Sequence, residues 1–406
     1  MPGQRNSLKI GSPKPNWLAV AISVILFVCL GMVTIGLVYL RSPYLVETIP
    51  AGEGVFSTHP VWTFETADTI VARPVVQGSR VFIQTSQNLY ALEATTGELA
   101  WSAESLGDPN DSKLFAYDDF VLASERRAPI ATFTAGAGEL LWRHSPQGDF
   151  QPTDPSAVTA TLEYAPPNYT PVQSVTFARD IAYVTRFNWK LTAYDLERGQ
   201  IIWEASLPGR TFATVVTDGD TLYVDTGRIL KAYDATTGTV LWEQDVGEVI
   251  GKLVLDGSNL YMSCALLDNN CILSMDVETQ ALLWEVDYDT LGVPEIFHLS
   301  FNEGGLYGAG DSLVAIDAKN GNILWQSDLI GPLGPPTILD DKVYVKAEDS
   351  TLYAFDIKNG RLEGRLSMKS SLPLRQPRDS EEYGPVVVDD LLIVPLGGNR
   401  VYAYRT

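Results

Sequence analysis

The sequence is poor in the residues that build metal and redox centres. It has 406 residues but only three cysteines and three histidines. No Cys-x-x-Cys occurs and no two cysteines are adjacent, which excludes a four-cysteine zinc site and a disulfide-rich scaffold. His59, His144 and His298 lie far apart and lack the short spacing of metal-ligand motifs. The sequence therefore predicts no metal site.

Signatures of nucleotide-dependent and hydrolytic enzymes are also missing. The chain contains no Gly-x-Ser-x-Gly elbow, no P-loop and no dinucleotide fingerprint. Acidic pairs such as Asp340-Asp341 and Asp389-Asp390 lie where hairpins are expected, and their side chains are typical of tight turns. We therefore predict no catalytic residues and no cofactor.

Positive charge is scarce as well. The formal net charge is −21 at pH 7. The first 40 residues hold three basic residues and no acidic ones, so the rest of the chain is more acidic still. A body of this charge repels phosphate backbones, which argues against a nucleic-acid partner.

One long uncharged run lies near the N-terminus. Trp17 to Leu40 would span about 36 Å as a helix at 1.5 Å per residue, enough to cross a bilayer. Arg5, Lys9 and Lys14 precede it, so the positive-inside tendency places residues 1–16 in the cytoplasm. We predict a single-pass anchor of the cell membrane over residues 17–40, a linker over 41–59 and an extracytoplasmic body. A cleaved signal peptide is the alternative.

The rest of the chain is built from one repeated pattern. An alternating strand is followed by an acidic residue, a turn ending in glycine, and then tryptophan, as in the stretch from Leu89 through Gly97 to Trp101. Copies recur about every 40 residues, a spacing typical of propellers with four short strands per unit. The tryptophans that mark the copies are Trp62, Trp101, Trp142, Trp203, Trp242, Trp284 and Trp325. The sequence predicts an all-β, eight-bladed β-propeller over residues 60–406.

The repeated residues are expected to stabilise the fold. Glycine at the turn can adopt the positive φ that the turn requires. Each tryptophan can bury its ring between neighbouring blades while the indole N–H reaches a backbone carbonyl. The last repeat, residues 385–406, is one strand short, and Pro60 to Phe64 supplies the sequence of the missing strand. Pairing the two ends of the chain would remove an exposed sheet edge.

This Leu-Tyr-Ala-Leu-Glu-Ala-Thr-Thr-Gly-x-x-x-Trp pattern resembles the PQQ-like repeat, and within that superfamily the chain looks most similar to BamB-like propellers. The resemblance implies a non-catalytic scaffold that binds protein partners at a membrane. It leaves open a PQQ-dependent, quinoprotein-type oxidoreductase, although the adjacent cysteine pair of those enzymes is missing. An extracytoplasmic ligand or polysaccharide sensor is the third possibility.

Two further features indicate sites. Cys264 and Cys271 flank a short hairpin, where they could form a disulfide or remain free thiols. The spacing between Trp142 and Trp203 is longer than the others, and the insertion is rich in proline, which favours a loop. This loop should share one face with turns that carry basic and aromatic residues. We hypothesise that a partner docks on this face through Arg126, Arg127, Arg186, Phe187, Trp189, Tyr164, Tyr169, Arg375 and Arg378; the alternative is an insertion without function.

Overall fold

The structure is a computed structural model of the chain. It describes residues 53–54, 56, 59–104, 112–124, 130–144, 150–152, 172–186, 189–207, 213–249, 251–266, 269–288, 292, 296–347, 351–367, 384–396 and 398–405. The chain divides into two compact units, Met1–Leu45 and Val46–Thr406. The predicted cytoplasmic segment 1–16 and anchor 17–40 lie outside the described residues. Within those residues, no helix has both the length and the apolar character needed to cross a membrane.

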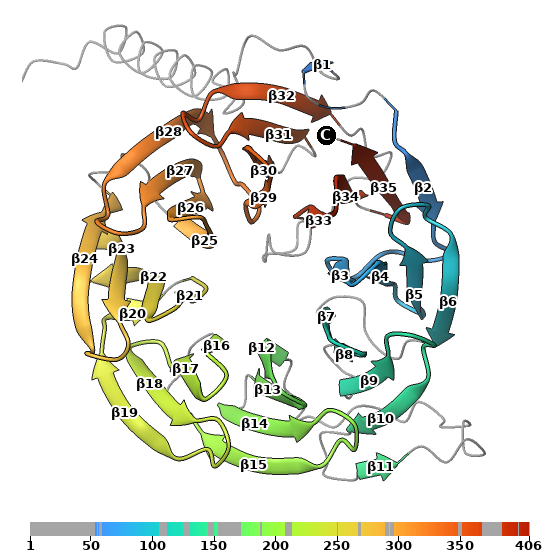
Figure 1. Cartoon of the computed structure of the whole chain (residues 1–406), viewed down its shortest axis with the longest axis horizontal. Helices are drawn as coiled ribbons and strands as arrows, with labels where there is room; N and C mark the ends of the chain where they lie inside the picture. Colours follow the sequence, from blue (N-terminus) through green and yellow to red (C-terminus); the bar gives the residue numbers. More distant parts are fainter. Residues whose placement is uncertain are drawn as a thin grey trace, which may run out of the picture. The chain divides into compact units, whose positions relative to one another are not determined.

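The second unit is an eight-bladed β-propeller, as predicted: eight antiparallel sheets follow one another around a ring (Figure 1). Blade 1 contains β3 (Val75–Gln77), β4 (Arg80–Gln84), β5 (Asn88–Glu93) and β6 (Leu99–Glu104). Blade 2 contains β7 (Lys113–Tyr117), β8 (Phe120–Ser124), β9 (Ile130–Thr134), β10 (Leu140–His144) and β11 (Phe150–Pro152). Blade 3 contains β12 (Val172–Ala178), β13 (Ile181–Arg186), β14 (Lys190–Asp195) and β15 (Ile201–Ser206). Blade 4 contains β16 (Val215–Thr217), β17 (Thr221–Asp225), β18 (Ile229–Asp234) and β19 (Val240–Asp245).

The second half of the ring repeats this order. Blade 5 contains β20 (Glu248–Val249), β21 (Val254–Asp256), β22 (Asn259–Leu266), β23 (Asn269–Asp276) and β24 (Ala281–Asp287). Blade 6 contains β25 (Ile296–Asn302), β26 (Gly305–Gly310), β27 (Ser312–Asp317) and β28 (Ile323–Ile330). Blade 7 contains β29 (Thr337–Leu339), β30 (Lys342–Lys346), β31 (Thr351–Asp356), β32 (Leu362–Ser367) and β1 (Glu53–Gly54). Blade 8 contains β33 (Val386–Val388), β34 (Leu391–Leu396), β35 (Arg400–Arg405) and β2 (Trp62–Glu65).

The repeated turn is built as its sequence predicts. In blade 4 the Asp234 carboxylate accepts hydrogen bonds from the backbone N–H groups of Thr236 and Thr237, at 3.0 and 2.7 Å. The bonds from Thr237 are the main reason that the pKa of Asp234 lies below its usual value. Gly238 ends the turn with a φ of 70°. The acid and the glycine therefore reverse the chain between the third and fourth strands.

The tryptophans join successive blades. Six of the seven indoles donate a hydrogen bond from Nε1 to a backbone carbonyl of the following blade, as Trp62 does to Ala94 at 2.8 Å. The ring also lies against the turn glycine of that blade, because a Cβ added to Gly97 would be 2.6 Å from the Trp62 ring. Turn glycines are thus needed for two reasons, positive φ and the close approach of an indole.

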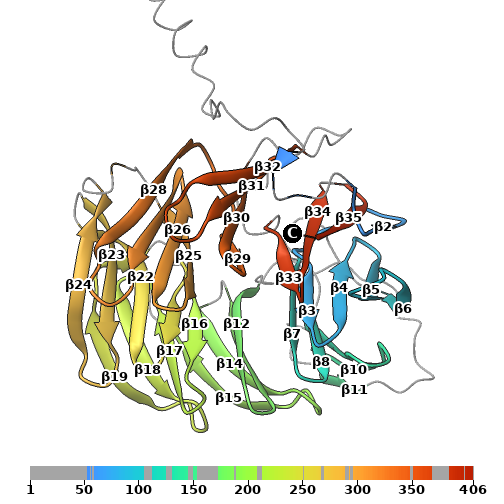
Figure 2. The ribbon, with the colours of Figure 1, turned by 45° about the horizontal axis from the view of Figure 1, so that its top comes forward.

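Blade 8 is completed by the N-terminal strand of the propeller. β2 pairs antiparallel with β35, with Trp62 opposite Ala403 and Phe64 opposite Val401. Val61 adds a further hydrogen bond from its N–H to the Ala403 carbonyl, 2.7 Å long. The pairing expected for Pro60 to Phe64 is therefore present (Figure 2).

The propeller begins earlier than the sequence indicated. β1, inside the predicted linker 41–59, pairs with β32 on the outer edge of blade 7. Phe56 is buried and packs its ring edge-on against Tyr344, with the ring centres 5.9 Å apart. The insertion after Trp142 also contributes a short strand, β11, to the outer edge of blade 2. Both additions lie at edges, where a proline such as Pro152 is tolerated.

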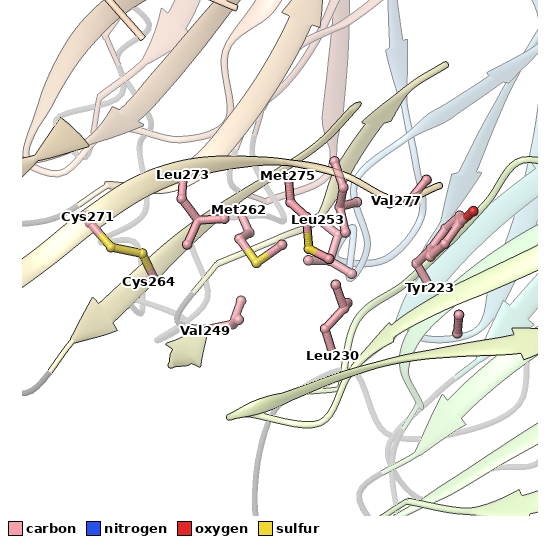
Figure 3. Close-up of a cluster of buried hydrophobic side chains, with 12 residues drawn as sticks. Tyr223, Leu230, Val249, Leu253, Met262, Cys264, Cys271, Leu273, Met275 and Val277 are labelled. Atoms are coloured by element: carbon pink, nitrogen blue, oxygen red, sulfur yellow. A yellow bond between two sulfur atoms is a disulfide. The ribbon is translucent and has the colours of Figure 1, made fainter. Parts of the chain in front are cut away.

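A disulfide joins Cys264 and Cys271 in the hairpin of β22 and β23, the pairing hypothesised from the sequence. The two residues are directly opposite each other, with Cα atoms 5.0 Å apart. Figure 3 shows the bond at one end of the apolar cluster between blades 4 and 5, where Met262 and Leu273 continue the row. The disulfide is fully buried and extends this core.

Candidate functional site

The ring has two faces with different chemistry. Because neighbouring strands in a blade are antiparallel, the turns between second and third strands lie on the same face as the connections to the next blade. Hydrogen bonds show this directly: the Leu207 N–H donates to the Trp189 carbonyl, and the Val249 N–H to the Gly227 carbonyl, each at 2.6 Å. We call this face the connection face and the opposite one the hairpin face.

The hairpin face is strongly acidic. Its turns between first and second strands place exposed Asp118, Asp340 and Asp389 in the left-handed region, with φ of 49°, 52° and 50°. Aspartate tolerates this conformation better than most residues. The acidic pairs in the sequence are thus turn residues, as predicted. Within the described residues, no group of three or more His, Cys, Asp or Glu side chains is placed to hold a metal ion.

The connection face presents one aromatic side chain in a constrained turn. Trp189 is 44% exposed and has a φ of 58°, unusual for a bulky residue. Its N–H donates to the Arg186 carbonyl at 3.0 Å, and its own carbonyl accepts from Leu207. Two backbone hydrogen bonds therefore hold the turn while the indole stays in solvent. A strained, exposed aromatic residue is more typical of a binding surface than of a folding contact.

Arg186 does not lie on the surface, which corrects the expectation that it is an exposed arginine of this face. It is only 6% exposed. The reason is that β13 continues through Arg186, which pairs with Val172 on one side and Lys190 on the other. The guanidinium lies near His144 of blade 2: burial lowers the pKa of His144 most, and the positive charge of Arg186 lowers it further. Arg186 is a buried cation between two blades.

The other predicted docking residues cannot be placed. Arg126, Arg127, Phe187, Tyr164, Tyr169, Arg375 and Arg378 lie outside the described residues. Of the nine residues, the structure describes two, the buried Arg186 and the exposed Trp189, three positions apart on blade 3.

Two buried charges went unrecognised in the sequence. Asp225, at the end of β17, is 1% exposed, and burial raises its pKa to about 7 against the hydrogen bond from the Gly227 N–H. Lys346, at the equivalent end of β30, donates to the Pro395 carbonyl at 3.1 Å, and burial lowers its pKa to about 8. Both look like turn residues in the sequence, and only the packing of neighbouring blades buries them.

Solved structures similar to this one include a BamB protein and alcohol dehydrogenases. BamB from Moraxella catarrhalis superposes with a TM-score of 0.60 at 14% identity, covering 86% of this chain and 97% of BamB. A quinohemoprotein alcohol dehydrogenase from Pseudomonas putida HK5 superposes with a TM-score of 0.58 at 12% identity, covering 87% of this chain and 76% of the enzyme. At such identities the likeness shows the fold alone.

Comparison with related sequences identifies the family. The chain is 24% identical over 299 residues to outer membrane protein assembly factor BamB of Yersinia pestis, covering 68% of this chain and 69% of that protein. It is 25% identical over 323 residues to tetrathionate hydrolase of Acidithiobacillus ferrooxidans, covering 68% of this chain and 60% of the hydrolase. The family model described as outer membrane protein assembly factor BamB matches residues 126–266 and 268–406, more than half of the chain. The chain belongs to this BamB family of PQQ-like repeat propellers.

Proposed function

We propose that this protein is a non-catalytic binding scaffold, anchored to the cell membrane by residues 17–40, whose extracytoplasmic propeller docks a protein partner on the connection face. The observation that carries the proposal is Trp189, a solvent-exposed indole held at positive φ by two backbone hydrogen bonds. Exposed tryptophans are strongly enriched among the residues that dominate protein interfaces.

Two further observations support the proposal. The chain shares its family with BamB, an outer membrane protein assembly factor. The buried Cys264–Cys271 disulfide is typical of an oxidising compartment, which agrees with a propeller outside the cytoplasm.

Site-specific crosslinking tests the proposal. A photo-crosslinking amino acid replaces Trp189 in the full-length chain, and crosslinks are formed in native membranes. We expect one discrete protein at this position and not at the matched exposed position Thr95, which lies on the hairpin face. The captured protein, once purified, should bind the wild-type chain and bind Trp189→Asn at least tenfold more weakly.

Asparagine is chosen because it adopts positive φ readily and so preserves the turn while removing the indole. Unchanged thermal unfolding of Trp189→Asn would show that the propeller is intact. Identical crosslinked products from positions 189 and 95 would contradict the proposal. Equal affinity of the purified partner for the wild-type chain and for Trp189→Asn would contradict it too.

A PQQ-dependent oxidoreductase is the second candidate, favoured by the similarity to tetrathionate hydrolase and by the fold shared with the alcohol dehydrogenase. The residues present do not match a quinone site of that type: no two cysteines are adjacent, and the described residues hold no metal-binding cluster. The test is to supply the full-length chain with PQQ, Ca²⁺ and an artificial electron acceptor and assay alcohols and tetrathionate. Turnover above the protein-free control would replace the scaffold proposal.

A further inference from the structure

The outermost strand of a blade has one edge that faces away from the ring. Two blades have this edge covered by the chain itself: β11 pairs with β10, and β1 pairs with β32, both antiparallel (Figure 1). In the part of the chain that the structure describes, no further strand pairs with β15, β19 or β24, the outer strands of blades 3, 4 and 5. An unpaired edge is a template for an added strand.

Both added strands use the same register. On blade 2, Pro152 lies opposite Trp142 and Gln151 opposite Arg143. On blade 7, Gly54 lies opposite Gly364, the residue at the tryptophan position of its repeat. An added strand thus pairs with the tryptophan position and with the residue that follows it. This geometry is available on every blade whose outer edge is open.

The residue after the tryptophan position is basic on the two covered edges and acidic on three of the open ones. The covered strands carry arginine there, Arg143 and Arg365, and the register places Glu53 opposite Arg365. Three of the six outer strands that have no added partner among the described residues carry exposed glutamates instead: Glu204 of β15, Glu243 of β19 and Glu285 of β24. The other outer strands, β6, β28 and β2, have the neutral residues Ser102, Gln326 and Thr63. Opposite charges directly across an antiparallel pair are stabilising, so the open glutamate edges favour a basic residue.

Apolar residues stand just before the tryptophan on the same three strands. Each strand has two such residues in a row, and the exposed fractions of these side chains are 43% to 56%. The pairs are Ile201 and Ile202, Val240 and Leu241, and Leu282 and Leu283. On covered blade 2 the equivalent Leu140 and Leu141 are half-buried. The open edges therefore leave apolar area in water that an added strand could cover.

Ion pairs within the blades do not prevent such binding. Glu204 pairs with Lys190 at 3.0 Å and Glu243 with Lys231 at 2.8 Å, each across to the neighbouring strand. The Lys190–Glu204 pair is exposed on both sides and such pairs contribute little to stability, while in the second pair the Glu243 side chain is 61% exposed, so a second cation can reach either carboxylate. Glu285 has no ion-pair partner within the described residues, which makes β24 the simplest of the three edges.

We propose that β15, β19 and β24 accept an extended segment of a partner protein as an added antiparallel strand, with Lys or Arg opposite the glutamate and an apolar residue opposite the residue before tryptophan. Backbone hydrogen bonds supply affinity in such strand addition, and the flanking side chains supply selectivity. In the direction of its own chain, the segment carries the order basic-x-apolar. This surface is separate from the connection face.

Peptide binding tests the proposal on the full-length chain. The probe is a fluorescent peptide of repeated Lys-Thr-Val-Thr, and its counterpart is Glu-Thr-Val-Thr. We expect saturable binding of the basic peptide and slower amide exchange within 201–206, 240–245 and 281–287. The variant Glu204→Arg/Glu243→Arg/Glu285→Arg should bind the basic peptide at least tenfold more weakly and should gain binding of the acidic one, which also shows that it is folded.

The matched control is Glu98→Arg/Asp256→Arg/Glu278→Arg, three exposed acids of the hairpin face with the same change in net charge. An equal loss in this control would mean general attraction to an acidic body and would overturn the proposal. Protection elsewhere in the ring would overturn it too. Dimers that form without peptide binding and disappear in the edge variant would assign the edges to a second copy instead. Trp189→Asn should bind the basic peptide with the affinity of the wild type and, like the wild type, should not bind the acidic one. The peptide test is therefore independent of the proposed docking face.

Discussion

The indole nitrogen of Trp62 lies 2.8 Å from the carbonyl oxygen of Ala94, which ties the strand that completes blade 8 to blade 1. Trp62 is 8% exposed and belongs to a core that includes Ile83 and Val401. One side chain therefore connects residues from both ends of the propeller.

Truncating Trp62 should destabilise the whole ring. Trp62→Ala removes a buried indole and its hydrogen bond, and we expect the free energy of unfolding to fall by about 3–5 kcal/mol. Trp189→Asn, which removes an exposed indole, should change it by much less. Urea unfolding followed by tryptophan fluorescence measures both; equal losses would contradict the structural role of Trp62.

Substituting two glycines by alanine distinguishes the cost of backbone strain from the added cost of a steric clash. Gly78 and Gly97 both have positive φ, 58° and 71°. A Cβ on Gly78 would meet nothing within 4 Å, whereas one on Gly97 would lie 2.6 Å from the Trp62 ring. We expect Gly78→Ala to cost about 1–2 kcal/mol, the cost of a left-handed L-residue, and Gly97→Ala clearly more. Thermal unfolding of the two variants checks the order, and a smaller loss for Gly97→Ala would refute it.

Asp225 should make stability depend on pH. Its pKa is raised from 3.8 to about 7 by burial, so the folded state holds a proton that the unfolded state releases. Stability is therefore lost as the pH rises from about 4 to 7 and stays constant above. Asp225→Asn should remove this loss, and its stability relative to the wild type should increase by roughly 4 kcal/mol over that interval.

Chemical denaturation at a series of pH values checks the Asp225 prediction. Asp225→Ala provides the comparison, because it removes the charge and also the acceptor of the Gly227 N–H. Both variants should show the same change in pH dependence, with Asp225→Ala less stable throughout. If the stability of the wild type changed with pH in the same way as that of Asp225→Asn, the raised pKa of the buried Asp225 carboxyl would be contradicted.

Removing the disulfide should weaken blade 5 without abolishing the fold. Cys264 and Cys271 enclose a short loop with a separation of seven residues, for which loop closure predicts a loss of about 2–3 kcal/mol. Cys264→Ala/Cys271→Ala should show this loss in the absence of reductant. Reductant present during thermal unfolding should lower the unfolding temperature of the wild type, because the bond is reduced once the hairpin opens. The unfolding temperature of the variant should not change. Equal responses of the two proteins would argue against the bond.

The repeat explains how much of the fold could be predicted. Aspartate, glycine and tryptophan act within one blade or between adjacent ones, so their spacing determines the turns, the blades and the need for a closing strand. The strands β1 and β11 could not be predicted, because Glu-Gly and Phe-Gln-Pro show no alternation and pair only through an edge that the ring provides.

The candidate site was less predictable than the fold. Trp189 was expected on the connection face because it lies in a turn between the second and third strands of its repeat, and the structure places it exposed in that turn. Arg186 was misplaced because β13 extends to include it, and strand ends are not defined by the sequence pattern. Asp225 and Lys346 are charged residues near turns in the sequence, and their burial depends on neighbouring blades. Charges between blades are a property of the assembled ring.

The pairing of β2 with β35 has a consequence for biosynthesis. β2 is synthesised at the start of the propeller, and its partner β35 is synthesised more than three hundred residues later. The two strands can pair only after β35 has left the ribosome or the translocation pore. Seven blades can form in order during synthesis, but β2 remains a single exposed strand until the last residues arrive, and such a delay invites aggregation. A pull from the N-terminal side would act first on the pair of β1 and β32, which would therefore shield the late-forming contact of β2 and β35 from load.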